Sequence, residues 1–270
     1  MTNTLLFSPE ALRETPDAVL VDVRPAPDRF LPGALHAPLC PSFVDRGEPG
    51  RGRNPWKDVR EVRSFLASIG VAPGDTVVFY DEGGMGSAAR AWYASLLSGF
   101  PKAALLDGGF ALWTRLGLET AENPARRPAK AFSPLEQDPA GVFTFEETLE
   151  IFRKDSHALL DARPHDRWLG LSEPVDARPG RIPGSVSLPA SRLLKDGRLR
   201  SPEEIRAVFA ETLRGDDRPV LHYCGSGIAA SLTIFAARLA GLPYAGLYPG
   251  SWSEWCVRST IGESGESTPR

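Results

Sequence analysis

The sequence predicts an α/β protein made of two tandem copies of one domain, each a mostly parallel sheet with helices on both faces. Two observations support this fold class. Short apolar strands alternate with helical segments along the chain, and three sequence patterns recur in one order at nearly one spacing. A chain of 270 residues, 42% hydrophobic and 24% charged, is long enough for two domains with cores of their own.

The internal repeat begins with a strand that ends in Asp-x-Arg. Residues 18–25 (AVLVDVRP) match residues 158–164 (ALLDARP), and a Pro-Gly turn follows each strand, at residues 32–33 and 183–184. Asp22 and Asp161 lie about 140 residues apart, and the two later patterns keep nearly this spacing. Those later patterns pair residues 75–81 with 218–224 and residues 106–113 with 248–255. The repeat therefore predicts a duplicated domain.

The alternation within each copy gives the elements in order. The first copy is expected to contain helices over residues 59–69 and 88–98 and strands over 76–80 and 103–106; the second, helices over 202–213 and 228–240 and strands over 220–223 and 244–247. Residues 119–141 are rich in proline and charge and lack periodicity, which predicts a linker. The predicted domains are residues 1–118 and 142–270.

One cysteine stands where a strand is predicted to turn into a helix. The apolar run 219–223 ends at Cys224, two glycines follow, and helical sequence begins at about Ile228. Such a turn brings backbone N–H groups to the sulfur at the positive end of a helix dipole, which favours a thiolate. Gly225 and Gly227 let the backbone approach the sulfur closely. The alternative interpretation is a small buried hydrophobic residue at a strand end.

The remaining composition argues against several classes of protein and partner. Cys40, Cys224 and Cys256 are an odd number without a Cys-x-x-Cys pair, so neither a disulfide framework nor a zinc or other metal site is expected. A net charge of −3 without a basic stripe makes nucleic acid an unexpected partner. The N-terminus has no basic signal region and no window approaches a membrane span, which predicts a cytoplasmic protein without a membrane partner. The oligomeric state is left open.

The two copies differ at the position of the cysteine. Asp81 stands in the first copy where Cys224 stands in the second. A carboxylate there cannot act as a thiolate nucleophile, so only the second copy is expected to be catalytic.

Together these features resemble the rhodanese-family sulfurtransferases. The resemblance rests on the duplicated Asp-x-Arg strand and Pro-Gly turn, the loop Cys-Gly-Ser-Gly-Ile-Ala at residues 224–229 and the closing Gly-Ser-Trp-Ser-Glu-Trp at residues 250–255, and it extends roughly from Phe7 to Arg258. It implies two rhodanese-like domains and an enzyme without a cofactor. The Cys224 thiolate would take sulfane sulfur from a small-molecule donor, form a persulfide and pass the sulfur to cyanide or a thiol.

The loop also bears on the sulfur donor. Within the family, mercaptopyruvate-type members resemble Cys-Gly-Ser-Gly, whereas thiosulfate-type members carry basic residues after the cysteine, so 3-mercaptopyruvate is favoured over thiosulfate here. The resemblance implies that Arg167 and Arg178 bind the donor carboxylate. Solvated or salt-bridged arginines are the alternative for these two side chains.

The resemblance further implies roles for the loop residues. Ser226 would act on the substrate by a hydrogen bond, with capping of the following helix as its alternative role. Contacts to substrate are expected from Gly225, Gly227, Ile228 and Ala229. Mercaptopyruvate-type members also use an Asp and a His of the first copy; near those positions this chain has Cys40 and Arg53-Asn54-Pro55, and His36 does not match the motif.

The sequence bears on two other functions. A cysteine phosphatase needs an arginine six residues after its cysteine, and Ala230 stands there, which argues strongly against phosphoryl chemistry. A protein that only carries persulfide sulfur or binds a partner would keep the loop without repeated turnover. The sequence favours the enzyme.

Overall fold

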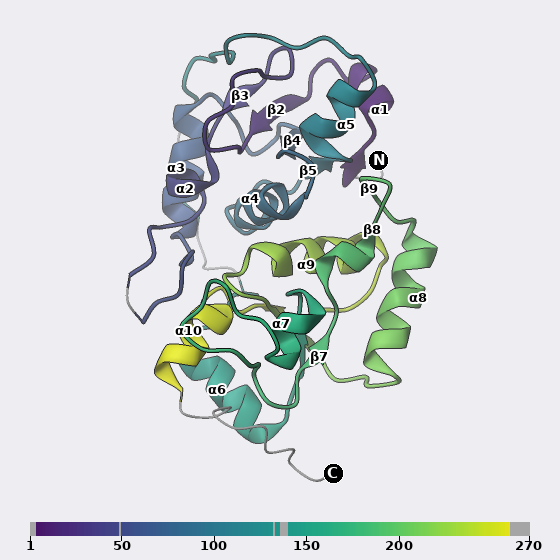
Figure 1. Ribbon diagram of the computed structural model, residues 1–270. Coiled ribbons are helices and arrows are strands. Elements are labelled where there is room, and N and C mark those ends of the chain that lie inside the picture. Colours follow the sequence, from purple (N-terminus) through teal and green to yellow (C-terminus); the bar gives the residue numbers. More distant parts are fainter. Residues whose placement is uncertain (1–3, 49, 132, 136–139, 260–270) are drawn as a thin grey trace. The chain divides into compact units, whose positions relative to one another are not determined.

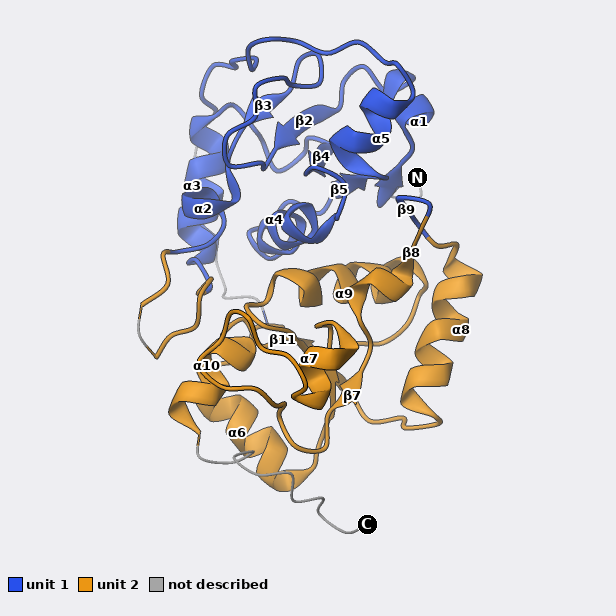
Figure 2. Ribbon diagram, in the orientation of Figure 1, with its two compact units in different colours: residues 1–45, 56–140, 196–199 blue, residues 46–55, 141–195, 200–270 orange. Residues whose placement is uncertain are grey.

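The computed structural model describes residues 4–48, 50–131, 133–135 and 140–259 (Figure 1). Two compact units divide the chain. The first contains Met1–Asp45, Trp56–Ala140 and Asp196–Leu199, and the second Arg46–Pro55, Gly141–Lys195 and Arg200–Arg270 (Figure 2). The chain passes from the first unit to the second between residues 140 and 141, at the end of the predicted linker 119–141. Residues 132 and 136–139 of this linker lie outside the described residues. Residues 46–55 belong to the second unit and residues 196–199 to the first, although their neighbours in the sequence belong to the other unit. The sequence did not predict these two assignments.

A parallel five-stranded sheet in the order β1-β5-β4-β2-β3 forms the first unit. Its elements are β1 (Leu6–Phe7), α1 (Pro9–Arg13), β2 (Val19–Asp22), β3 (Leu35–His36), α2 (Leu39–Ser42), α3 (Val59–Ser68), β4 (Val77–Tyr80), α4 (Gly86–Leu97), β5 (Ala103–Leu106), α5 (Gly109–Arg115) and the short β9 (Arg198–Leu199).

Helices cover both faces of this sheet because side chains alternate along β4. Val78 and Tyr80 pack in one core with Leu12 of α1 and Phe110 of α5. Phe79 points to the opposite face, where its ring meets that of Phe43 edge to face and where α4 packs on β4 and β5.

The second unit repeats this plan with a parallel four-stranded sheet in the order β11-β10-β6-β7. Its elements are α6 (Phe145–Lys154), β6 (Ala158–Asp161), α7 (His165–Leu169), β7 (Val186–Ser187), the 3-10 helix η1 (Ala190–Leu193), β8 (Leu194–Lys195), α8 (Pro202–Leu213), β10 (Val220–Tyr223), α9 (Ile228–Leu239), β11 (Gly246–Leu247) and α10 (Ser251–Arg258).

Its central strand β10 again carries alternating side chains. Leu221 and Tyr223 pack in a core with Ile151 of α6 and Trp252 of α10. His222 points to the other face, where its Nδ1 lies 2.8 Å from Oγ1 of Thr233 in α9. No helix among the described residues is both long and apolar enough to cross a membrane.

The Asp-x-Arg pattern has the same role in both copies. Each aspartate is fully buried at the end of a strand and binds the arginine two residues later, at 2.7 Å for Asp22–Arg24 and 2.6 Å for Asp161–Arg163. The same Arg163 guanidinium donates to the carbonyl of Gly180, and that of Arg24 to the corresponding stretch before the first Pro-Gly turn. These matched contacts confirm the predicted duplicated α/β fold.

The expected element boundaries hold to within a few residues. Helix α8 begins with a capping box of Ser201 and Glu204 and has Pro202 at its first position. Because both features are local sequence patterns, the sequence predicts the first residue of this helix correctly. The strand expected over 244–247 is reduced to two residues, because its ladder with β10 pairs Gly246 and Leu247 alone.

Candidate active site

Cys224 lies at the carboxyl end of β10, between β6 and β11 and directly before α9. It is 3% exposed, and its Sγ accepts the backbone N–H groups of Ser226 at 3.4 Å and Gly227 at 3.1 Å. Gly227 has φ +78°, the left-handed conformation that turns the chain into α9 and that glycine adopts without strain. The loop therefore offers an anionic sulfur two N–H donors at the N-terminus of a twelve-residue helix.

The first turn of α10 holds this loop in place. The N–H of Cys224 donates to Oγ of Ser251 at 3.1 Å, and its carbonyl accepts the N–H of Trp252 at 2.9 Å. Ser253 N–H donates to the carbonyl of Gly225 at 3.0 Å. The closing segment at residues 250–255 thus fixes the cysteine loop through the backbone.

The loop after β4 shows what the duplicated turn can hold. Asp81 occupies it, and its two carboxylate oxygens accept four backbone N–H groups at 2.9–3.1 Å, from Gly83, Met85, Ser87 and Ala88. Helix α4 begins five residues after Asp81, whereas α9 begins four residues after Cys224. Both copies therefore hold a side chain that accepts hydrogen bonds from backbone N–H groups, four at Asp81 and two at Cys224, and the second copy does so in a tighter turn.

Two arginines of the second unit lie beside Gly225. Arg167 belongs to α7, and Arg53 comes from the segment 46–55. A Cβ placed on Gly225 would lie 2.6 Å from Nη2 of Arg53 and 3.5 Å from Nη2 of Arg167. This close approach explains why glycine follows the cysteine: any side chain there would meet the guanidinium groups.

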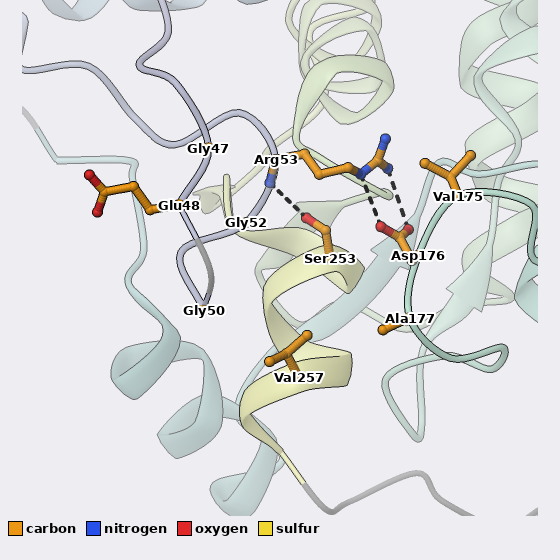
Figure 3. A pocket seen from close by; sticks show the side chains of 10 residues that line it. All are labelled: Gly47, Glu48, Gly50, Gly52, Arg53, Val175, Asp176, Ala177, Ser253 and Val257. Carbon is orange, nitrogen blue, oxygen red and sulfur yellow. Dashed lines mark hydrogen bonds and ion pairs between the residues drawn. The ribbon is translucent and has the colours of Figure 1, made fainter.

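Both guanidinium groups bind the carboxylate of Asp176. Nε of Arg53 donates to its Oδ1 at 2.9 Å (Figure 3). Nη2 of Arg167 donates to its Oδ2 at 2.9 Å. Arg167 also donates to Oε1 of Glu173 at 2.6 Å, and Arg163 lies 3.4 Å from that carboxylate. The arginines and carboxylates therefore alternate in one chain that runs from Arg53 to the buried Asp161–Arg163 pair.

The two carboxylates of this chain differ in electrostatic environment. Burial raises the pKa of Asp176 above its ordinary value, and the negative charge of Glu173 adds to the rise although Arg53 and Arg167 oppose it. Burial would also raise the pKa of Glu173, but hydrogen bonds from Arg167 and from backbone N–H groups outweigh it and lower that pKa. Glu173 is thus the firmly ionised member, and Asp176 the one whose negative charge is least favoured.

A pocket of about 420 Å³ opens against this cluster (Figure 3). Glu48, Arg53, Asp176 and Ser253 supply its polar side chains, and Val175 and Val257 are among its apolar ones. Cys224 does not line it, but Ser253 and the Arg53–Asp176 pair both contact or approach Gly225, the next residue in the chain. The pocket therefore adjoins the cysteine loop.

The other predicted site residues are spread more widely. Ser226 is 7% exposed within the loop, and Ile228 and Ala229 begin α9, half-buried. The residue that caps α9 is Gly227, without a side-chain hydrogen bond, so the expected capping by Ser226 is not what starts this helix. Arg178 turns elsewhere: its guanidinium donates to the carbonyl of Ser259 at 2.6 Å. The structure thus brings Arg167 to the loop and sends Arg178 to the end of α10.

The sequence alone shows for Arg53 only that it lies near the position where mercaptopyruvate-type members have a histidine. Its glycine-rich surroundings, residues 47–52, were the available signal, because such a segment can pass close to another backbone. Gly52, at φ +81°, does so: a Cβ there would lie 2.8 Å from the carbonyl oxygen of Gly250. His36, the other residue considered, binds the carbonyl of Arg24 through Nε2 at 2.9 Å.

The cysteines are all free, Cys40 being exposed and Cys256 buried in α10, where burial raises the pKa of its thiol. Within the described part of the chain, no three His, Cys, Asp or Glu side chains are grouped so that they could hold a metal ion. The groups that the structure places at the loop are the Cys224 sulfur, its N–H donors and the nearby arginines.

A comparison with protein families decides the relationship. The model of the rhodanese-like domain matches residues 9–116 and 144–258. The chain belongs to the rhodanese family. This rhodanese-like protein is 38% identical over 240 residues to the "Probable 3-mercaptopyruvate sulfurtransferase" of Pseudomonas aeruginosa, covering 84% of this chain and 81% of that protein. It is 31% identical to the thiosulfate sulfurtransferase of Cricetulus griseus, covering 89% and 84%.

Solved structures agree with this assignment. The crystal structure of SseA from Escherichia coli, described as a 3-mercaptopyruvate enzyme with the rhodanese fold, is similar with a TM-score of 0.78 and 26% identity, covering 93% of this rhodanese-like protein and all of that chain. The 3-mercaptopyruvate sulfurtransferase of Leishmania major is similar with a TM-score of 0.80 and 25% identity, covering 94% and 75%. The resemblance predicted from the sequence is confirmed.

Proposed function

We propose that this rhodanese-like protein is a sulfurtransferase that moves sulfane sulfur from 3-mercaptopyruvate, through a persulfide on Cys224, to cyanide or a thiol. The observation that carries the proposal is the Cys224 sulfur, which accepts the N–H groups of Ser226 and Gly227 beside two arginines. Such a cradle stabilises an anionic sulfur without a metal or an organic cofactor. The chain is similar in sequence both to a relative named for 3-mercaptopyruvate and to one named for thiosulfate, so thiosulfate is the second candidate donor.

In the first half-reaction the Cys224 thiolate attacks the sulfur of mercaptopyruvate. The new S–S bond forms as the C–S bond of the donor breaks, and the electron pair goes to carbon as the enolate of pyruvate. The proton of the donor thiol moves to that carbon, which leaves pyruvate and a Cys224 persulfide anion. The N–H groups of the loop can then bind the terminal sulfur as they bind the thiolate.

In the second half-reaction an acceptor attacks the outer sulfur of the persulfide. Cyanide forms a new C–S bond, the S–S bond breaks, and its electron pair returns to Cys224 as thiolate, with thiocyanate as product. A thiolate acceptor leaves as a persulfide in the same way. The loop therefore begins and ends the cycle with an anionic sulfur.

The residues around the loop divide the remaining work in this proposal. Arg167 and Arg53 bind the donor carboxylate, since a guanidinium fork matches a carboxylate and both lie next to Gly225. Ser226 donates to the ketone oxygen, where charge develops as the C–S bond breaks. Gly227, Ile228 and Ala229 line the sulfur cradle, and Arg178 acts through the end of α10, where it binds Ser259. A cytoplasmic location stays a prediction.

The decisive experiment compares wild type with Cys224→Ser, using Cys40→Ser as the control for loss of an exposed thiol. With 3-mercaptopyruvate and cyanide, Cys224→Ser should lose thiocyanate production by about a thousandfold or more, whereas Cys40→Ser should match wild type. Mass spectrometry of wild type after donor alone should show the gain of one sulfur atom on Cys224. Equal rates for wild type and Cys224→Ser would discard the mechanism.

Parallel assays with thiosulfate decide the donor and the alternative to catalysis. A higher kcat/KM with thiosulfate would replace the donor and keep the mechanism. A protein that takes up one sulfur atom and then releases no product over repeated cycles would be a persulfide carrier.

A further inference from the structure

Asp176 holds an unusual position for a carboxylate in a site for anionic donors. Its side chain is 1% exposed, yet it lies between Nε of Arg53 at 2.9 Å and Nη2 of Arg167 at 2.9 Å. Its Oδ2 lies 3.4 Å from where a Cβ of Gly225 would stand. The two guanidinium groups that face the cysteine loop are therefore already occupied by a carboxylate of the protein itself.

We propose that Asp176 sets the donor specificity of the site, because its carboxylate occupies the two arginines until an anionic donor displaces it. The inference rests on the proposed function, and it concerns the selection among donors rather than the sulfur chemistry. The group that Asp176 presents to Arg53 and Arg167 is chemically the group that 3-mercaptopyruvate would present. Binding of the donor is then an exchange of one carboxylate for another on the same guanidinium groups.

The neighbouring Glu173 does not share this role. It binds Arg163 and Arg167, accepts the N–H groups of Val175 and Asp176, and lies behind the pocket rather than in its wall. Asp176 lines the pocket, and the contacts that its carboxylate makes are with the two arginines. Arg53 is 40% exposed and can follow a ligand into the pocket, whereas Arg167 is held at 15% exposure by Glu173. Glu48 also lines the pocket but pairs with Arg51, so Asp176 is the pocket carboxylate that a ligand must displace to reach Arg53 and Arg167.

Charge explains how this arrangement selects among donors. The cluster balances Arg53, Arg163 and Arg167 against Asp161, Glu173 and Asp176. A monocarboxylate donor adds one negative charge to this neutral cluster, and a dianion such as thiosulfate adds two. Asp176 repels each added charge. Its charge therefore weakens the binding free energy of a dianion about twice as much as that of a monoanion. The resident carboxylate therefore favours mercaptopyruvate over thiosulfate.

The test measures binding of two unreactive anions to the full-length protein by calorimetry. Pyruvate is the monocarboxylate probe and sulfate the dianion probe, and neither requires turnover. Asp176→Asn keeps the size of the side chain and removes its charge. We expect it to bind pyruvate about threefold and sulfate about tenfold more tightly than wild type, since the second charge doubles the electrostatic gain.

The matched control is Asp216→Asn. Asp216 also pairs with an arginine, Arg218, at 2.6 Å, but it precedes β10, at the end of the strand opposite Cys224. Its substitution changes the net charge equally and should leave both dissociation constants unchanged. Weaker or unchanged binding of both anions by a folded Asp176→Asn protein overturns the proposal, because Asp176 would then only orient the arginines.

A second variant keeps the proposal testable if Asp176→Asn does not fold. Arg53→Gln changes a largely exposed side chain and should weaken pyruvate binding about threefold, by removing half of the fork. An unchanged dissociation constant for this variant also overturns the proposal.

Donor assays are read separately: in Asp176→Asn the ratio of kcat/KM for thiosulfate to that for mercaptopyruvate should rise about threefold. Wild type that turns over neither donor refutes the proposed function, while the anion titrations still report on Asp176.

Discussion

At the scale of single residues, the site depends on one position without a side chain. Gly225 follows the cysteine, and its Cα faces the tips of Arg53 and Arg167. Cys224 obtains its N–H donors from residues two and three positions ahead, so the sulfur cradle is a local structure. The arginines reach Gly225 from distant segments, so the arginine cluster beside the loop is not a local structure.

We predict that Gly225→Ala impairs donor binding more than catalysis. The new methyl group would stand 2.6 Å from Nη2 of Arg53, whose exposed, flexible end can move away. The fold should therefore persist, with the free energy of unfolding changed by about 0.5 kcal/mol or less. KM for 3-mercaptopyruvate should rise about fivefold with kcat nearly unchanged, because one arm of the carboxylate fork is displaced.

Gly84→Ala is the control for this prediction. It lies in the corresponding loop of the first copy, and a Cβ there meets no atom within 4 Å. Steady-state kinetics of both variants provide the measurement. A fall in kcat with an unchanged KM for Gly225→Ala would show that Arg53 does not bind the donor.

At the scale of elements, the turns after β4 and β10 show how one backbone motif serves two purposes. Each runs from the end of a central strand to a helix of the same length, α4 or α9. In the first copy the carboxylate of Asp81 satisfies four N–H groups permanently. In the second copy two N–H donors face the Cys224 sulfur, which in the proposed mechanism gains and loses a further sulfur atom. Backbone N–H donors thus hold a structural carboxylate in the first turn and, in the proposed mechanism, a reactive sulfur in the second.

Asp81→Asn should destabilise the first unit by about 2 kcal/mol. The amide nitrogen of asparagine cannot accept hydrogen bonds, so two of the four N–H groups would face another donor in a buried loop. Chemical denaturation of the full chain, followed by tryptophan fluorescence, measures the change. Asp28→Asn, an exposed position of the same unit, controls for the loss of one charge. Equal stability of the two variants would contradict a structural role for the Asp81 carboxylate.

At the scale of the whole molecule, charge and chain path combine to build the site. The second unit includes residues 46–55, which precede α3 of the first unit in the sequence. This segment supplies Arg53 and extends the chain of ion pairs that begins at the buried Asp161. A second domain beginning at residue 142 would keep the cysteine loop and Arg167 but would lack Arg53. The second structural unit is therefore larger than the domain that a boundary at residue 142 would define.

The pH dependence of stability provides a test of that ion-pair chain. The pKa of Glu173 is lowered in the folded protein, as described above, from an ordinary value of 4.5. A carboxyl group with a depressed folded pKa stabilises the fold above its unfolded pKa, and this contribution is lost as the pH falls through the folded pKa. Ionised Glu173 thus contributes fully at neutral pH and progressively less below about pH 4.5.

We expect Glu173→Gln to cost about 3 kcal/mol at neutral pH, because it removes the buried carboxylate that Arg163 and Arg167 share, and we expect the difference from wild type to shrink under acid conditions. Urea denaturation near pH 7 and well below pH 4.5 measures both values. Glu150→Gln, which breaks an exposed pair with Lys154, should change little at either pH. A constant difference between Glu173→Gln and wild type across this range would show that Glu173 does not titrate below its ordinary value.

The sequence by itself determined the local parts of this protein. The duplicated strands, the Asp-x-Arg ends, the capped helix α8 and the turn around Cys224 are each encoded within a few consecutive residues, by periodicity, capping and glycine placement. Asp81 in place of the cysteine likewise distinguished the two copies without any structure. Backbone conformation over such short stretches depends mainly on adjacent residues.

Only the tertiary structure decided which charged side chains meet at the loop. Arg53 and Asp176 are 123 positions apart, and their pairing depends on the path of residues 46–55 into the second unit. Arg167 and Arg178 both flank Glu173-Pro174 in the sequence, yet one reaches Gly225 and the other the end of α10. Ion pairs between long side chains are set by where distant segments pack, and no local pattern encodes that arrangement.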